Sequence, residues 1–84
     1  MYSVIFDSEA LNFLEKIEKQ LAKRIWEKIM SIKENPHHFF DRLTKRTDYK
    51  LRIGNYRVIA DINDNLKRIE VMVIDYRNRI YKKI

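Results

Sequence analysis

A Gly54-Asn55 pair contains the only glycine of the 84-residue chain. The pair stands between two segments in which apolar and polar residues alternate, residues 48–53 and residues 56–62. Such alternation is typical of strands with one buried face, and a two-residue turn with glycine at a positive φ joins antiparallel strands. The sequence therefore predicts a β-hairpin whose turn also fixes its register.

The predicted register places two arginines opposite each other. With Ile53 opposite Tyr56, Arg52 faces Arg57 on the face away from the core, and Lys50 follows one step along that face. Facing like charges destabilise a sheet by roughly a few tenths of a kcal/mol unless an anion lies beside them. We interpret this local cost as an anion-binding surface; two long side chains splayed into water are the alternative.

Two more strands and a helical segment complete the predicted elements. Residues 2–6 are aromatic and β-branched, which predicts an opening strand, and residues 67–75 are apolar on both faces in their middle, which predicts a central strand. Across residues 9–34 apolar side chains recur every three or four positions, with Ser8 as the expected N-cap and Pro36 after the end. The predicted class is α+β: a strand, helices, and a three-stranded antiparallel meander.

Composition narrows the class of protein. The length, an apolar share of 45% and a single proline predict one ordered domain over residues 1–84. No stretch is apolar enough to span a bilayer, the first residues lack a signal-peptide pattern and there are no cysteines, so we expect a cytoplasmic protein without thiolate chemistry. One glycine cannot supply a glycine-rich phosphate loop, which excludes the usual nucleotide-binding folds.

The net charge of +6 comes from the second half of the chain. Residues 1–40 hold six basic and six acidic side chains, whereas residues 41–84 hold twelve basic and six acidic ones. Because residues 67–75 run antiparallel to the hairpin, the basic tail that follows them is expected at the same end of the sheet as the hairpin cations. Such a field attracts polyanions, although a surface that merely aids solubility explains it too.

The basic surface has groups that RNA cleavage without a metal would need. That reaction takes a base for the 2′-hydroxyl, cations for a pentavalent phosphorane and a proton for the leaving 5′-oxygen. Arginine and lysine bind phosphate, and Tyr81 among cations is a candidate base, while packing at the edge or stacking on a nucleobase explains Tyr81 equally well. His37 and His38 are adjacent and no further ligand has suitable spacing, so we expect no metal and no cofactor.

The order of elements and three short motifs resemble the RelE/ParE toxin superfamily over nearly the whole chain. The motifs are Lys-Leu-Arg at 50–52, Gly-x-Tyr-Arg at 54–57 and Arg-x-x-x-Tyr at 77–81. The resemblance implies two antiparallel helices on the sheet, which divides the helical segment near Gln20. It implies cleavage of mRNA in the ribosomal A site for RelE-type members and poisoning of DNA gyrase for ParE-type members.

For the RelE-type branch the resemblance also implies residue roles. Arg57 matches the hairpin arginine, Arg77 a C-terminal acid or phosphate stabiliser and Tyr81 the base; the candidate catalytic residues are Lys50, Arg57, Arg77 and Tyr81. Further basic residues are expected to bind RNA, namely Arg52, Arg79, Lys82, Lys83, Lys45 and Arg46. Two departures from the pattern are Asp48, where some relatives have lysine, and Tyr76, where many have histidine.

The resulting prediction is a RelE-type toxin of a type II toxin–antitoxin system. Its expected partners are a cognate RelB-type antitoxin, which should be acidic and form a hetero-oligomer with it, and mRNA in the A site of the small ribosomal subunit, with no membrane. Exposed apolar area on the helices around Trp26 offers the antitoxin further contact. The alternatives are a ParE-like gyrase inhibitor without nuclease activity and a non-catalytic RNA-binding module.

Overall fold

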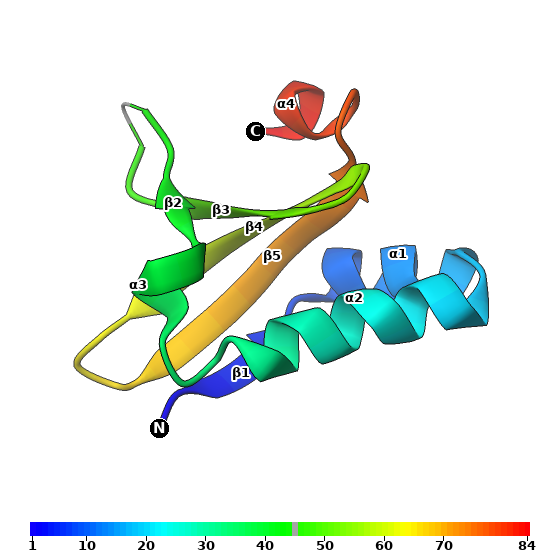
Figure 1. Ribbon diagram of the computed structural model, residues 1–84. Helices are drawn as coiled ribbons and strands as arrows, with labels where there is room; N and C mark the ends of the chain where they lie inside the picture. The colour runs from blue at the N-terminus through cyan, green and yellow to red at the C-terminus, as the bar shows by residue number, and fades with distance from the viewer. Residues whose placement is uncertain (45) are drawn as a thin grey trace.

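Five strands form one sheet in the computed structural model, which describes residues 1–44 and 46–84 (Figure 1). The sheet order is β1-β5-β4-β3-β2; β1 runs parallel to β5, and every other neighbouring pair is antiparallel. The strands are β1 (Ser3–Phe6), β2 (Asp41–Arg42), β3 (Tyr49–Ile53), β4 (Tyr56–Asn63) and β5 (Arg68–Tyr76). The predicted strands are present, and the two-residue β2 was not predicted.

Helices cover both faces of this sheet unequally (Figure 1). Two longer helices pack on one face and a single turn of helix packs on the other, while a second short helix lies in the connection that leads to β2. They are α1 (Ser8–Lys16), α2 (Lys19–Ser31), α3 (Pro36–Phe39) and α4 (Ile80–Lys83). The α+β class is therefore confirmed, and no helix among the described residues has the length and hydrophobicity that crossing a membrane requires.

Two details of the helical prediction differ from the structure. The N-cap of α1 is Asp7 rather than Ser8, because Ser8 already has helical geometry. The segment divides at Ile17, which is extended, and Glu18, which is not helical, so the break lies two residues before the predicted Gln20. Neither α3 nor α4 was predicted, since four-residue helices carry too short a pattern to be recognised.

The hairpin has the predicted register. Ile53 pairs with Tyr56, and Arg52 pairs with Arg57 directly across β3 and β4. Gly54 takes φ of 55° in the turn, a conformation that side chains with a Cβ rarely adopt. On its other side Arg57 pairs with Asp75 of β5, so the hairpin arginine lies between a like charge and an opposite one.

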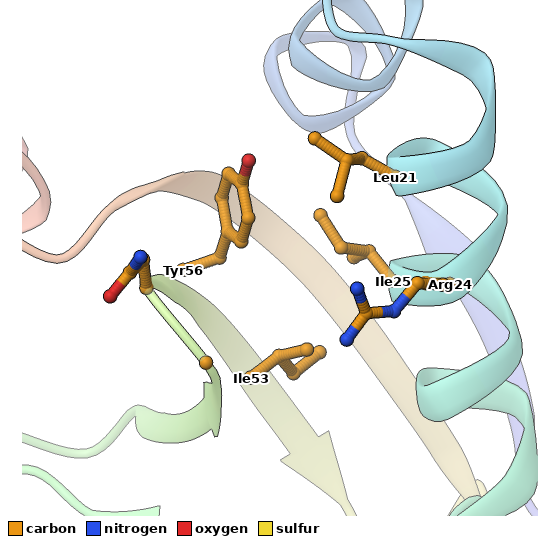
Figure 2. Close-up of a pocket in the computed structure, with 7 residues that line it drawn as sticks. Leu21, Arg24, Ile25, Ile53 and Tyr56 are labelled. Carbon is orange, nitrogen blue, oxygen red and sulfur yellow. The ribbon is translucent and has the colours of Figure 1, made fainter.

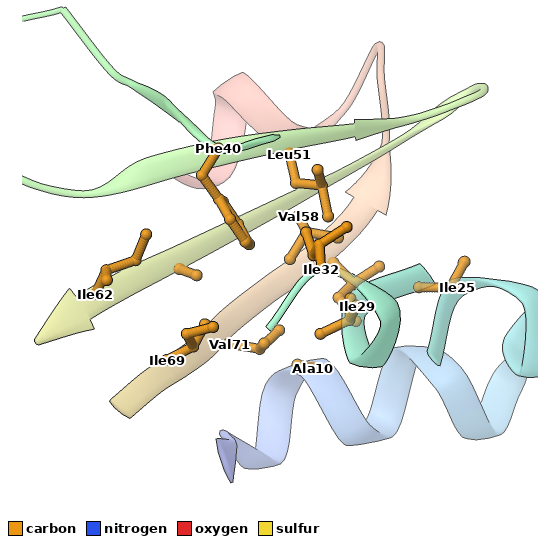
Figure 3. Close-up of a cluster of buried hydrophobic side chains, with 12 residues drawn as sticks. Ala10, Ile25, Ile29, Ile32, Phe40, Leu51, Val58, Ile62, Ile69 and Val71 are labelled. Carbon is orange, nitrogen blue, oxygen red and sulfur yellow. The ribbon is translucent and has the colours of Figure 1, made fainter. Parts of the chain in front are cut away.

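The main core lies between the sheet and α1 and α2 (Figure 3). Isoleucines along one stripe of α2 meet the alternate side chains of β4 and β5, which is why the two patterns were visible in the sequence. Burying each such side chain contributes about 1.5–3 kcal/mol. The cluster comprises Ala10, Ile25, Ile29, Ile32, Phe40, Leu51, Val58, Ala60, Ile62, Ile69, Val71 and Ile74.

A smaller cluster covers the opposite face. Ile80 of α4 packs there with Leu43, Ile59 and Val73, and Met72 and Ile84 border the group. β5 is thus buried on both faces, as predicted for a central strand. This second cluster is what holds the C-terminal helix over the basic side of the hairpin.

Candidate nucleic-acid interface

A cavity of about 370 Å³ opens on the α4 side of the sheet. β3 contributes Lys50, α4 contributes Tyr81, and the connection between β2 and β3 contributes Arg46, so three predicted site residues line one space. The full lining of this cavity, here called the Tyr81 cavity, is Arg42, Leu43, Thr44, Arg46, Lys50, Tyr81 and Ile84. A phenol and an ammonium group therefore face a common opening among guanidinium groups.

The position of Tyr81 follows from that of its neighbour Ile80. Ile80 is completely buried in the smaller cluster, which fixes the orientation of the single helical turn. Because consecutive helical side chains point about 100° apart, Tyr81 turns out of the cluster and remains 50% exposed. The buried isoleucine presents the tyrosine to the cavity.

Arg57 is the most enclosed cation of the site. It is 6% exposed, and its Nη1 donates hydrogen bonds of 2.8 Å to the carbonyl oxygens of Gly54 and Tyr56. Nε and Nη2 have no hydrogen-bond partner among the described residues. One edge of the guanidinium is held by the turn, and the other edge makes no hydrogen bond within this part of the chain.

Burial lowers the pKa of Arg57, and repulsion from Arg52 and, more weakly, Arg77 lowers it further, whereas Tyr81 acts in the opposite direction. Arginine nevertheless remains protonated, so Arg57 is a cation confined near other cations. Groups perturbed in this way are concentrated at functional sites. Arg52 lies directly opposite Arg57 in the strand register, and the charges of Arg77 and Tyr81 also act on its guanidinium.

Arg77 lies at the tip of the hairpin. Its backbone N–H donates a 2.7 Å hydrogen bond to the carbonyl oxygen of Asn55, which ties the end of β5 to the turn. It lines a shallow cavity of about 310 Å³ with Asn55, Tyr76 and Asn78. Arg77 therefore follows β5 beyond the residue that pairs with Arg57, at the end of the hairpin away from Lys50.

Arg46 is bound by the residue that departs from the family pattern. Its Nε and Nη2 donate to the two carboxylate oxygens of Asp48 at 2.8 and 2.7 Å. This bidentate bond, opposed in part by burial, lowers the pKa of the Asp48 carboxyl. The aspartate thus neutralises a cation at the rim of the cavity, and phosphate would have to compete with it.

The structure separates Arg79 and Lys83 from this cavity. The Arg79 guanidinium lies 5.5 Å from the centre of the Tyr76 ring, and Lys83 pairs with Asp75 and Glu9. Both side chains line another cavity, of about 350 Å³, on the α1 side. The expected convergence of the whole tail on one site therefore does not extend to these two residues, and their RNA contact stays a prediction.

The remaining predicted RNA-binding residues do not line the Tyr81 cavity or are not described by the structure. Arg52 is exposed opposite Arg57, and Lys82 is exposed on α4. Lys45 lies outside the described residues. Arg42 and Thr44, which line the Tyr81 cavity, were not predicted because they fall in a connection without a recognisable pattern; the one available clue was that Arg42 belongs to the basic half.

A cavity of about 260 Å³ lies on the opposite face, between α2 and the hairpin (Figure 2). Figure 2 shows Arg24 extending from α2 toward Ile53 and Tyr56. Leu21 and Ile25 complete its helical wall. It holds a single cation against mostly apolar side chains, and so lacks the clustered charge of the Tyr81 cavity.

His37 has a partner far from these cavities. Its Nε2 lies 2.7 Å from Oδ1 of Asp64, and the Tyr2 hydroxyl donates to the same oxygen at 2.7 Å. The Tyr2 hydrogen bond and, next, the one from His37 lower the pKa of the Asp64 carboxyl. This arrangement joins the chain start, α3 and the turn after β4, which is a structural role.

The sequence comparison gives the family of a chain with this fold and basic cavity. Residues 4–81 match the family described as the ParE toxin of type II toxin-antitoxin systems, parDE. The chain belongs to this family and is a toxin of a type II toxin–antitoxin system. No curated protein matches the sequence significantly.

Solved structures confirm the fold. The toxin in the RelBE2 toxin–antitoxin complex of Mycobacterium tuberculosis superposes with a TM-score of 0.83 at 22% identity, covering 90% of this chain and 98% of that one. The archaeal RelE–RelB complex of Pyrococcus horikoshii gives a TM-score of 0.74 at 25% identity, covering 93% of this chain and 97% of that one. The isolated E. coli RelE toxin gives a TM-score of 0.76 at 20% identity, covering 99% of this chain and 94% of that one. The predicted superfamily is confirmed.

Proposed function

We propose that this toxin is an endoribonuclease of the RelE type that cleaves mRNA in the ribosomal A site without a metal. The observation that carries the proposal is the cavity lined by both Tyr81 and Lys50, together with the buried Arg57, whose charge interacts with Tyr81. The site combines a phenol that can exchange a proton with cations that can hold a phosphate. Such a combination meets the needs of phosphoryl transesterification.

In the proposed reaction the phenolate form of Tyr81 accepts the proton of the 2′-hydroxyl and becomes a neutral phenol, and the 2′-oxygen attacks the adjacent phosphorus. Lys50 and the free edge of Arg57 stabilise the additional negative charge of the phosphorane. The bond from phosphorus to the 5′-oxygen then breaks, and Arg77 protonates or neutralises that leaving oxygen. The products are a 2′,3′-cyclic phosphate, which can open to a 3′-phosphate, and a 5′-hydroxyl.

We further propose that a cognate RelB-type antitoxin inhibits the toxin in a hetero-oligomer. The M. tuberculosis and P. horikoshii toxins were solved in complexes with their antitoxins. An acidic antitoxin would complement the twelve basic residues of the second half of this chain. Exposed Leu11 and Trp26 on the helices add apolar area for a partner that extends around the molecule.

The test adds purified toxin to a translating extract and maps the ends of the mRNA. The wild type should produce new ends at A-site codons, whereas Tyr81→Phe and Arg57→Ala should not. In cells, Arg57→Ala and Arg77→Ala should relieve growth arrest while the purified variants keep their fold. Full toxicity of both arginine variants would show that the site is wrongly assigned.

The family match favours a second candidate, a gyrase inhibitor, because its description is that of ParE. In this case the basic face would bind a protein rather than cut RNA. Purified toxin, DNA gyrase and supercoiled plasmid distinguish the two candidates. Accumulation of gyrase-cleaved DNA together with intact mRNA would replace our proposal, and RNA binding without either effect would indicate a binding module.

A further inference from the structure

The C-terminal helix α4 has little intrinsic stability. It has four residues, and its N-cap residue Arg79 makes no side-chain capping bond. An isolated helix of this length does not persist in water, so contacts with the rest of the protein must hold it. Because α4 carries Tyr81, whatever holds α4 also determines where the phenol lies.

Two side chains of α4 make those contacts. Ile80 is buried in the smaller cluster, and Lys83, one turn further along, reaches across the end of the sheet. The Lys83 Nζ lies 3.0 Å from Oδ2 of Asp75 in β5 and 3.3 Å from Oε2 of Glu9 in α1. Tyr81 lies between these two points of attachment in the sequence.

The Asp75 carboxylate is suited to hold a cation. It is only 3% exposed, its Oδ1 accepts a 2.7 Å hydrogen bond from the backbone of Tyr76, and Oδ2 is bound by Lys83. A carboxylate so removed from water needs a positive partner. Arg57 pairs with Asp75 in strand register, but the structure gives no ion pair between their described side chains.

We propose that Lys83 is a positioning residue, which fastens α4 to Asp75 and Glu9 and so keeps Tyr81 over the cavity lined by Lys50. The inference rests on the proposed function. It changes the expected role of Lys83, which from its charge alone would be an RNA contact. With one ammonium and two carboxylates, the ion-paired cluster of Lys83, Asp75 and Glu9 has a net charge of −1 when all three groups are ionised.

The two roles of Lys83 give opposite results in a binding experiment. A phosphate contact removed in Lys83→Met should weaken RNA binding and reduce the slope of log affinity against log salt by about 1. A positioning residue should leave affinity within about twofold and the slope unchanged, yet slow single-turnover cleavage of ribosome-bound mRNA about tenfold. Lys83→Arg, which can bind both carboxylates, should restore most of the rate.

Two further variants help to distinguish a positioning role of Lys83 from a phosphate contact. Lys23→Met removes an exposed lysine from α2, on the other side of the molecule, and should affect neither rate nor binding. Glu9→Gln makes the protein more positive, so electrostatics alone would favour tighter RNA binding, but it removes one of the two negative charges that hold Lys83 and should slow cleavage about threefold. A Glu9→Gln variant that cleaves as fast as the wild type would argue against the ion-pair arrangement.

Hydrogen exchange gives a readout that does not depend on cleavage. In Lys83→Met the amides of residues 80–84 should exchange at least about fivefold faster, while amides of the main core are unchanged. Unchanged exchange of α4, or a lowered salt slope, would overturn the proposal. If the wild type cleaves no mRNA, the proposed function fails, and the exchange of α4 alone decides whether Lys83 fastens the helix.

Discussion

The two faces of the sheet are built for different purposes. The face under α1 and α2 buries twelve side chains in one cluster, all of them apolar. The face under α4 has a cluster of four, and around it lie Lys50, Arg52 and Arg57, the last buried against other cations. Stability comes mainly from the first face. On the second face neighbouring cations repel one another, and packing alone gives no reason for them to be there.

The largest expected effect is on the first face. Ile69→Ala removes a fully buried side chain of β5 and should lower the free energy of unfolding by about 2–5 kcal/mol. Ile5→Ala in β1 is the control, because that side chain is 42% exposed and should cost less than about 1 kcal/mol. Urea unfolding followed by circular dichroism measures both, and equal losses would contradict the assignment of the main core.

Ile80→Ala tests the smaller cluster. Ile80 is as buried as Ile69, but α4 is terminal and can detach, so the expected loss of unfolding free energy is only about 1–2 kcal/mol. Cleavage should fall much further, about a hundredfold, because Tyr81 would no longer be held at the cavity. If Ile80→Ala lowered the free energy of unfolding as much as Ile69→Ala does and left cleavage unchanged, the smaller cluster would serve stability and not the site.

Asp48→Asn should produce a smaller change that depends on pH. Its bond with the half-exposed Arg46 should contribute about 1 kcal/mol at neutral pH. Because the folded-state pKa of Asp48 is lowered, this stability is present above the unfolded pKa of about 3.9 and is lost as pH falls through the folded pKa. Wild type and variant should therefore differ in unfolding free energy at pH 7 and converge in acid; a constant difference would contradict this origin.

The same substitution should affect binding in the other direction. Without its carboxylate partner, Arg46 becomes available to phosphate at the rim of the Tyr81 cavity. RNA binding should tighten slightly, and the slope of log affinity against log salt should steepen by about 1. Titrations at several salt concentrations measure this, and an unchanged slope would show that Arg46 does not reach RNA.

The hairpin could be predicted from the sequence because the residues that determine it are close together in the chain. One glycine in a two-residue turn fixes the register, and the register alone brings Arg52 opposite Arg57. Lys50 then had to lie on the same face, one pleat away. The isoleucine stripe of α2 was equally visible, because helical periodicity extends over several turns.

The C-terminal part of the site depends on tertiary contacts and could not be predicted in the same way. The placement of α4 rests on the burial of Ile80 against strands distant in sequence. Lys83 and Arg79 turn toward α1 although their charge suggested the RNA face. Charge indicates what a residue can bind, but the packing of its neighbours decides which surface it reaches.

Under the proposed function the chemistry takes place on the α4 face of the sheet and not on the face covered by α1 and α2, and two arginine substitutions distinguish the two faces. Arg57 lies on the α4 side of the sheet, where its charge interacts with Tyr81, while Arg24 lines the cavity on the opposite face (Figure 2). In single-turnover cleavage of ribosome-bound mRNA, Arg57→Met should be slower by about 10²–10³-fold. Arg24→Met should remain within about twofold of the wild type. Equal loss in both variants, or a larger loss for Arg24→Met, would contradict the account.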